Sequence, residues 1–197
     1  MHSLIKIRIG GMNMIRYFLV FLLTCVVFIS GCTQERQTTP NQAIPEGFEA
    51  LTLTDQQKNE IFESAEKVGV DKVYVPAFVS KGQKLEKIET STEQVKFFKL
   101  IFADENESTY LEILEASEEV LLGEVVIEEK ETTINYDIPA KWISFSNHKD
   151  NIEVASAGLY FKKDTSFIRV REQKDNQTFR VSKSVEEIAS SLQPLTR

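Results

Sequence analysis

Between residues 55 and 68, apolar side chains recur at the spacing that places them on one face of an α-helix. The members of this stripe are Ile61, Phe62, Ala65 and Val68. Just before it, Thr54 and Gln57 have the spacing of a capping box, in which two side chains satisfy free N–H groups of the first turn. Gly69 follows at the position where helices commonly end on a left-handed residue. The pattern therefore predicts a helix over 55–68.

From residue 70 onward, apolar residues recur at every second position, which is the period of a β-strand. The segments with this pattern are 73–79, 95–103, 109–116, 132–138, 141–146, 158–163, 166–172 and 178–183. Pro76 cannot donate to a neighbouring strand, so the first segment is expected at a sheet edge, and Pro139 is expected to end the fourth. Segment 95–103 is apolar on both faces, which indicates a central strand covered on both sides or a strand that lines a cavity.

A second helical stripe follows the last strand. Its members are Val185, Ile188, Ala189 and Leu192. Ser184 and Glu187 have the spacing of a capping box, so this helix is expected to begin at Ser184 and to stop before Pro194. Glu186 is expected on its exposed face.

The order of these elements predicts an α+β fold. A curved antiparallel sheet, a meander of about six to eight strands, is expected to be covered by an N-terminal and a C-terminal amphipathic helix. The sheet face is the surface on which both apolar stripes can be buried. This single domain is expected to span residues 51–197. Residues 32–50 are polar and contain Pro40 and Pro45, which is typical of a flexible tether.

The first 31 residues have the layout of a signal peptide. An uncharged apolar run at 17–29 follows Arg16, and it is shorter than the roughly 20 residues that span a bilayer. It ends in Ile29-Ser30-Gly31-Cys32, which resembles the lipobox of bacterial lipoproteins. The resemblance implies cleavage before Cys32 and a diacylglycerol, with acyl chains such as palmitate, on the Cys32 thiol. An uncleaved signal anchor is the alternative. The candidate start residues are Met1, Met12 and Met14.

Charge and cysteine content narrow the classes of function. The chain has 197 residues, of which 23 are basic and 30 acidic. Residues 1–31 hold three basic and no acidic residues, so the remaining 166 carry 20 basic against 30 acidic. This balance argues against a general nucleic-acid binder, which needs a basic surface to release counterions. The cysteines are Cys25 and Cys32, so no disulfide framework or cysteine metal site is expected after them.

No enzyme motif is present, so no catalytic residue, cofactor or metal ion is expected. His148 is the one histidine after Cys32, and the polar residues around it predict a surface turn, where a histidine is not expected to have the partner that orients a general base. Arg169, Arg171 and Arg180 are expected on one face of the last hairpin. They either receive an anion or acidic partner or, as the favoured interpretation, pair with nearby glutamates on the exposed side of the sheet.

The segment 104–115 has some features of a calcium-binding loop. The residues at positions 1, 3, 5, 8 and 12 of such a loop are Asp104, Asn106, Ser108, Leu111 and Glu115. Thr109 stands where the sharp bend needs glycine, and the flanking segments have the pattern of strands. A hairpin turn is therefore the favoured interpretation.

The segments from about Ala157 to Leu195 have an order that resembles a known domain. A strand opens at Ala157-Gly158, the strands SFIRVRE and TFRVS follow, and SVEEIASSL forms a final helix. This order is similar to an uncharacterised envelope domain of Gram-positive bacteria that also occurs behind the transmembrane helix of some anti-sigma factors. Phe167 or Ile168 replaces the tryptophan usual in that domain's penultimate strand. The resemblance implies an envelope location and a final helix docked on the sheet, but no particular chemistry.

Together these features predict a lipid-anchored protein on the extracytoplasmic face of the cell membrane. The expected function is a non-enzymatic module that binds a protein partner or senses the state of the envelope. The alternative is a carrier or chaperone of an apolar, lipid-like ligand, with segment 95–103 lining a cavity under the sheet.

Replacement of Cys32 by Ala tests the lipid anchor. We expect the variant to lose metabolic labelling by a fatty-acid analogue and to accumulate as an unprocessed precursor, because the thiol is the acceptor of the lipid. Labelling and gel mobility of whole cells measure both effects. Labelled, processed protein in the variant would exclude Cys32 as the anchor.

Overall fold

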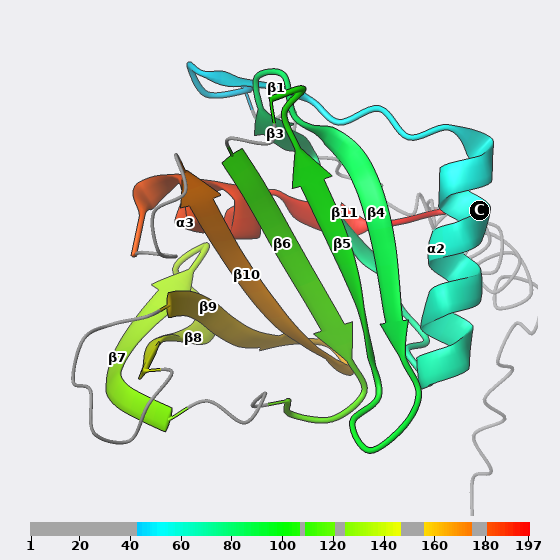
Figure 1. Cartoon of the computed structure of the whole chain (residues 1–197). Coiled ribbons are helices and arrows are strands. Elements are labelled where there is room, and N and C mark those ends of the chain that lie inside the picture. The colour runs from blue at the N-terminus through cyan, green and yellow to red at the C-terminus, as the bar shows by residue number, and fades with distance from the viewer. Residues whose placement is uncertain (1–42, 107–108, 121–124, 147–155, 175–180) are drawn as a thin grey trace, which may run out of the picture. The chain divides into compact units, whose positions relative to one another are not determined.

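The computed structural model describes residues 43–106, 109–120, 125–146, 156–174 and 181–197 (Figure 1). The chain divides into two units, Met1–Asn41 and Gln42–Arg197, and all described residues belong to the second. The helices of the described part are α2 (Asp55–Val68) and α3 (Lys183–Ser190). Its strands are β1 (Phe48–Ala50), β2 (Tyr74–Pro76), β3 (Phe78–Ser80), β4 (Lys84–Ser91), β5 (Phe97–Ala103), β6 (Thr109–Ala116), β7 (Val125–Ile134), β8 (Ile138–Ser146), β9 (Ser156–Lys163), β10 (Ser166–Lys174) and β11 (Leu192–Pro194).

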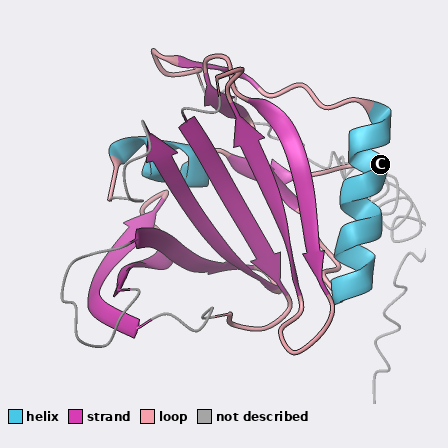
Figure 2. Cartoon of the chain, viewed as in Figure 1, coloured by secondary structure: helices cyan, strands magenta, loops and turns pink. Residues whose placement is uncertain are grey.

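A seven-stranded antiparallel sheet dominates this α+β fold, in the order β4-β5-β6-β10-β9-β8-β7 (Figures 1 and 2). The sheet is not one continuous meander as predicted. The chain crosses from β6 to the far edge, forms β7, and returns through β8 and β9 to pair β10 with β6. The charged residues of β7 suit an exposed edge, whereas Ile168 and Val170 of β10 are buried at the centre of the sheet.

Helix α2 has the predicted bounds and caps. The Gln57 N–H donates to the Thr54 hydroxyl at 3.2 Å, and the Thr54 N–H donates to the Gln57 side-chain oxygen at 2.9 Å. Gly69 ends the helix with φ +74°, in the left-handed region that glycine adopts without a steric cost. The buried side chains of the helix pack into the same core as those of β5.

Strand β5 has two different faces. Phe98, Leu100 and Phe102 are fully buried in the core, while Phe97 and Ile101 on the other face are only partly buried. These core residues therefore pack in the hydrophobic interior of the domain. β5 lies between β4 and β6, next to the edge of the sheet rather than at its centre.

The segment 132–138 forms a hairpin rather than the single strand predicted. β7 ends at Ile134, and Asn135 and Tyr136 have φ values of +51° and +68°. Two successive left-handed residues are typical of the tight turns that join antiparallel strands. Pro139 consequently lies near the start of β8 instead of ending a strand. The pattern of alternation continues through the turn, so it did not reveal the reversal.

The start of the final helix also differs from the prediction. The N-cap is Ser182, whose hydroxyl accepts from the Val185 N–H at 3.3 Å, while the Ser184 hydroxyl donates to Glu172. Helix α3 ends at Ser190, so Leu192 is buried in β11, paired with β2, and not on the helical stripe. Of the strand predicted over 178–183, residues 178–180 lie outside the described part, Val181 has no regular secondary structure, and Ser182 and Lys183 are the cap and the first residue of α3.

The predicted boundary at residue 51 and the predicted strand at 73–79 both need correction. Residues Phe48–Ala50, which the sequence assigned to the tether, form β1 and pair with β3. The segment around Pro76 divides into β2 and β3, which pair with β11 and β1 in two small sheets. Pro76 is thus on a strand of a two-stranded sheet, in agreement with its predicted edge position.

Glu115 of β6 is a fully buried carboxyl group in the core. Its two oxygens accept from the Tyr74 N–H at 3.0 and 3.2 Å, which ties β2 to the main sheet. Burial raises the pKa of Glu115 well above its ordinary value, although the Tyr74 N–H and the charge of Lys163 act in the opposite direction. Lys163 is itself held by the Leu192 carbonyl oxygen, which accepts from its ammonium group at 2.6 Å.

The buried face of α3 predicts unequal effects of two substitutions. We expect Ile188→Ala to lower the free energy of unfolding by about 2–5 kcal/mol, because Ile188 is fully buried in the core. Lys183→Ala, on the exposed side of the same helix, should change it by less than about 0.5 kcal/mol. Denaturant unfolding compares them, and equal midpoints would contradict the docking of α3.

The raised pKa of Glu115 predicts a stability that falls as the pH rises. The unfolded chain ionises near the ordinary value of 4.5, while the folded chain holds the proton to higher pH. Glu115→Gln keeps the shape and an acceptor oxygen but cannot ionise. We expect similar unfolding free energies for variant and parent at about pH 4, and a more stable variant at about pH 8. Denaturant unfolding at both pH values is the measurement. A variant that is less stable at the higher pH would overturn this account of Glu115.

Candidate functional site

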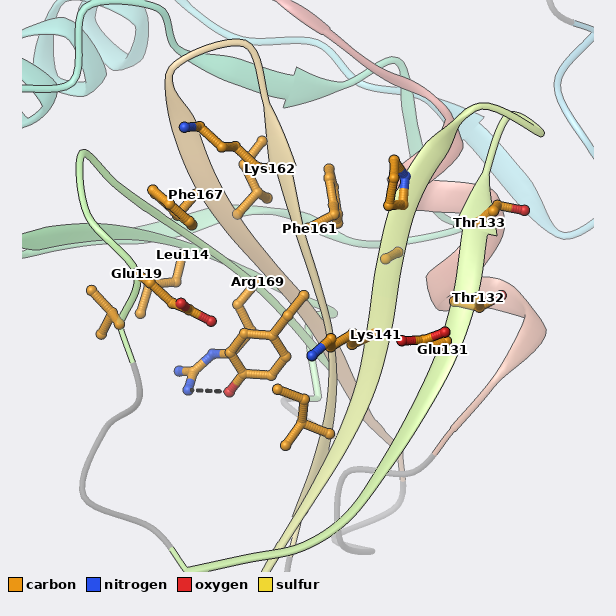
Figure 3. Close-up of a pocket in the computed structure, with 16 residues that line it drawn as sticks. Leu114, Glu119, Glu131, Thr132, Thr133, Lys141, Phe161, Lys162, Phe167 and Arg169 are labelled. Atoms are coloured by element: carbon orange, nitrogen blue, oxygen red, sulfur yellow. Dashed lines mark hydrogen bonds between the residues drawn. The ribbon is translucent and has the colours of Figure 1, made fainter.

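A pocket of about 620 Å³ is lined mainly by residues on the face of the main sheet that points away from the core, and Ala140, Phe161 and Ile168 of the core cluster also border it. We call this face the open face, defined by Leu114, Lys141, Tyr160 and Arg169, whose neighbours along each strand point into or toward the core. Figure 3 shows residues of β7 on one side of the pocket, and Leu114, Phe167 and Arg169 on the other. The lining also includes Glu119 and Val120, which follow β6.

The strand register builds the floor of this pocket. Pairing across five strands places one residue of each in a single row, formed by Glu131, Lys141, Tyr160, Arg169 and Leu114. A second row lies beside it, with Lys162 opposite Phe167. These residues are distant in the sequence, so the pocket depends on the register of the five neighbouring strands β6, β10, β9, β8 and β7.

Gly158 of β9 makes room for the polar centre of the pocket. A Cβ at this position would lie 3.1 Å from Tyr160 Cε2 and 3.3 Å from Arg169 Cγ. Both distances are shorter than ordinary van der Waals contact, so any larger residue would displace the phenol ring or the arginine stem. The absence of a side chain at Gly158 thus allows Tyr160 and Arg169 to lie side by side.

Arg169 is buried in the wall of the pocket, with only 1% of its surface exposed. Its Nη2 donates to Glu112 Oε1 at 2.6 Å, and its Nη1 donates to the Tyr160 hydroxyl oxygen at 3.3 Å. Arg171 donates to both oxygens of the same carboxylate, at 3.0 and 3.1 Å. The Arg169 Nε–H is buried and has no acceptor among the described residues.

This ion-pair cluster shifts the pKa values of its members. Burial by itself would raise the pKa of Glu112, but the Arg171 and Arg169 guanidinium groups outweigh burial and hold that pKa below its ordinary value. Burial by itself would lower the pKa of Arg169, but Glu112 and Tyr160 outweigh burial, so that the pKa of Arg169 is raised above its ordinary value. Both groups are therefore charged at neutral pH.

The rim of the pocket carries exposed charged groups. Lys141 donates to Glu129 at 3.2 Å, and the Lys162 ammonium lies 5.0 Å from the centre of the Phe167 ring. Glu119 and Glu131 are exposed carboxylates at the rim. The pocket thus combines apolar walls with charged groups of both signs. The most buried of these charged groups is the Arg169 guanidinium.

The structure brings together some of the residues singled out in the sequence. Arg169 and Arg171 share the open face and pair with Glu112, so the predicted glutamate partner is confirmed for these two arginines. The predicted exposed position is wrong for Arg169, which is buried together with Glu112. Arg180, Cys32, His148 and Ser108 lie outside the described residues.

The calcium-loop alternative for 104–115 does not fit the geometry. Asp104 Oδ1 accepts from the Thr109 N–H at 3.4 Å in the turn between β5 and β6. Glu115 lies near the other end of β6 and is buried in the core with Tyr74 as its partner. The described residues contain no group of three or more histidine, cysteine or acidic side chains placed to hold a metal ion.

Sequence patterns did not reveal the pocket or its key contact. The alternation of β9 and β10 predicted which residues share a face, but not which strand lies beside which. Gly158 and Tyr160 were the available signals, since a glycine inside a strand often marks a close approach of neighbouring groups.

Comparisons of the chain with protein-family models, with curated proteins and with solved structures find no match. In the described part of the chain, no helix has both the length and the apolar character needed to cross a membrane.

Proposed function

We propose that this chain is a bacterial lipoprotein, anchored through Cys32 at the outer face of the cytoplasmic membrane, whose domain is a non-enzymatic binding module. The pocket on the open face is its binding site. The lipobox-like residues 29–32 and the resemblance to an envelope domain support the location. The pocket supports the binding function.

The size and lining of the pocket are those of a small-molecule site. Ligand pockets generally occupy about 300–1,000 Å³ and combine apolar walls with a few placed polar groups. Here the volume is about 620 Å³, and Leu114, Ile143 and Phe167 provide apolar surface beside Arg169. This combination is the single observation that carries the proposal.

The state of the polar groups favours binding over catalysis. Lys141 and Arg169 are engaged with the carboxylates Glu129 and Glu112. A cation held in this way can orient a ligand by charge, but it is not available as a general base. We further propose that α2 and α3 cover the core side of the sheet, which leaves the open face to the ligand.

A second candidate function is a carrier of a lipid-like ligand. The apolar residues of the pocket favour it. However, the segment 95–103, which the carrier alternative placed along a cavity, contributes Phe98 and Phe102 to the packed core. A carrier moves its ligand between membranes, while a sensor retains it. Transfer of a fluorescent fatty acid between two vesicle populations, with and without the protein, separates the two functions.

Filling the pocket tests the binding site. We expect residues 32–197, with Cys32→Ser to omit the lipid, to bind the neutral fluorophore Nile red saturably. Thr133→Trp should weaken binding at least about tenfold, or about 1.4 kcal/mol, because the indole would occupy the pocket that Thr133 lines.

Lys130→Trp is the matched control, because Lys130 is also exposed on β7 but does not line the pocket. It should leave the affinity within about twofold. Absence of saturable binding, or an equal loss in both variants, would contradict the proposed site.

A further inference from the structure

We infer that the pocket selects amphipathic anions, molecules with an apolar body and one carboxylate or phosphate group, and that Arg169 is the residue that binds the anionic group. The inference rests on the proposed function and names the ligand class of the same site. It depends on the unusual position of Arg169, on its incomplete set of partners and on the location of the opposing charges.

Arg169 is a buried cation whose hydrogen bonds are only partly used. Arg169 donates one hydrogen bond to Glu112, from its Nη2. The same carboxylate also accepts two hydrogen bonds from Arg171. The Arg169 Nη1 donates to the Tyr160 hydroxyl oxygen at 3.3 Å, which is long for a hydrogen bond. The buried Nε–H has no acceptor in the described part of the chain.

Leaving a guanidinium in this state has an energetic cost. A buried donor without an acceptor loses its hydrogen bonds to water without replacing them, and the cost is greater for a charged group. A guanidinium presents its N–H groups in a planar fork that matches the two oxygens of a carboxylate or phosphate. An anion that entered the pocket and displaced the weak Tyr160 contact would therefore give Arg169 a second strong acceptor.

The charged groups of the pocket differ in how exposed they are to solvent. Glu119 and Glu131 are exposed at the rim, where water and salt screen their repulsion of an anion. Arg169 has only 1% of its surface exposed, so its attraction is screened much less, and the buried Glu112 carboxylate beside it is shared with Arg171. Lys141 stands between Glu131 and Tyr160 in the row that leads to Arg169, and its ammonium adds a second cation on the path of an anionic group.

The apolar residues accommodate the rest of the ligand. Leu114 lies directly opposite Arg169 on β6, and Phe167 lies two residues from Arg169 on β10. Ile143 of β8 lines the same pocket. An amphiphile can thus place its charged group against Arg169 and its apolar body against these side chains, which burial of apolar surface favours.

A series of ligands with one chain length tests this selectivity. The probes are dodecanoate, dodecyl phosphate, 1-dodecanol and dodecyltrimethylammonium, each below its micelle concentration, which compete with Nile red on residues 32–197 carrying Cys32→Ser. We expect at least one of the two anions to bind at least about tenfold more tightly than the neutral alcohol and the cation. The preference between the two anions identifies the headgroup.

Variants of the two arginines then locate the anion. Arg169→Met should reduce the affinity for the preferred anion to about that of dodecanol and leave dodecanol binding unchanged. Arg171→Met is the matched control, because Arg171 shares the strand, the face and the Glu112 partner but does not line the pocket. It should keep the preference for the anion.

Each result has a distinct meaning. If dodecanol binds as tightly as both anions in the parent protein, the ligand class is wrong while the pocket itself stands. If no probe displaces Nile red and Thr133→Trp has no effect on the fluorophore, the proposed function fails as well. If Arg169→Met does not fold, the parent series still decides the ligand class, and Lys141→Met, on the exposed rim, should lower the affinity for the preferred anion about threefold without affecting dodecanol.

Discussion

The pairing of β6 with β10 is the constraint on which the rest of the domain depends. It joins two runs of hairpins, β4–β6 and β7–β10, into one sheet through eight paired positions from Phe167↔Ala116 to Lys174↔Thr109. On the open face this register places Glu112 beside Arg169 and Arg171, and Leu114 opposite Arg169. On the core face it places Ile113 opposite Val170. A shift by one residue would turn every one of these side chains to the wrong face.

The two faces of the sheet bury their residues by different physical means. The core face buries aromatic and aliphatic side chains, so its stability comes mainly from removal of apolar surface from water. The open face buries a charged cluster, and buried charges are tolerated only when they are paired and hydrogen-bonded. Glu112 meets that condition fully through two arginines, whereas Arg169 meets it only in part. This difference is why Arg169 is the residue available to a ligand.

Local sequence signals predicted the elements whose ends are set by local contacts. The bounds of α2 follow from Thr54, Gln57 and Gly69, three residues that act within one turn of the helix ends. The start of α3 was wrong because Ser182 and Ser184 are both competent caps, and a distant residue, Glu172, engages the second. Glu186, predicted on an exposed face, accepts instead from the Trp142 indole at 3.0 Å. Such choices depend on tertiary contacts that no spacing pattern contains.

The candidate site was even less accessible from the sequence, because its residues come from separate strands. The sequence predicted that Arg169 and Arg171 share one face and pair with glutamates. The alternation of side chains along a strand predicts which residues share a face, but not which residues of other strands lie beside them. The identity of Glu112 as the partner, and the neighbours Tyr160 and Leu114, follow from the strand order and register. That order departs from a simple meander, so even the strands that the pattern located, such as β5, β6 and β10, were not given their correct order in the sheet.

The central claim is that this register forms a ligand site on the open face and not within the core. Backbone amide chemical shifts of residues 32–197 with Cys32→Ser, followed during titration with dodecanoate, test it most directly. The account predicts that the largest changes cluster at Leu114, Lys141, Tyr160 and Arg169, with α2 and the β2–β11 pair unaffected. Changes centred on α2, α3 or β5 would place the ligand in the core and contradict the account.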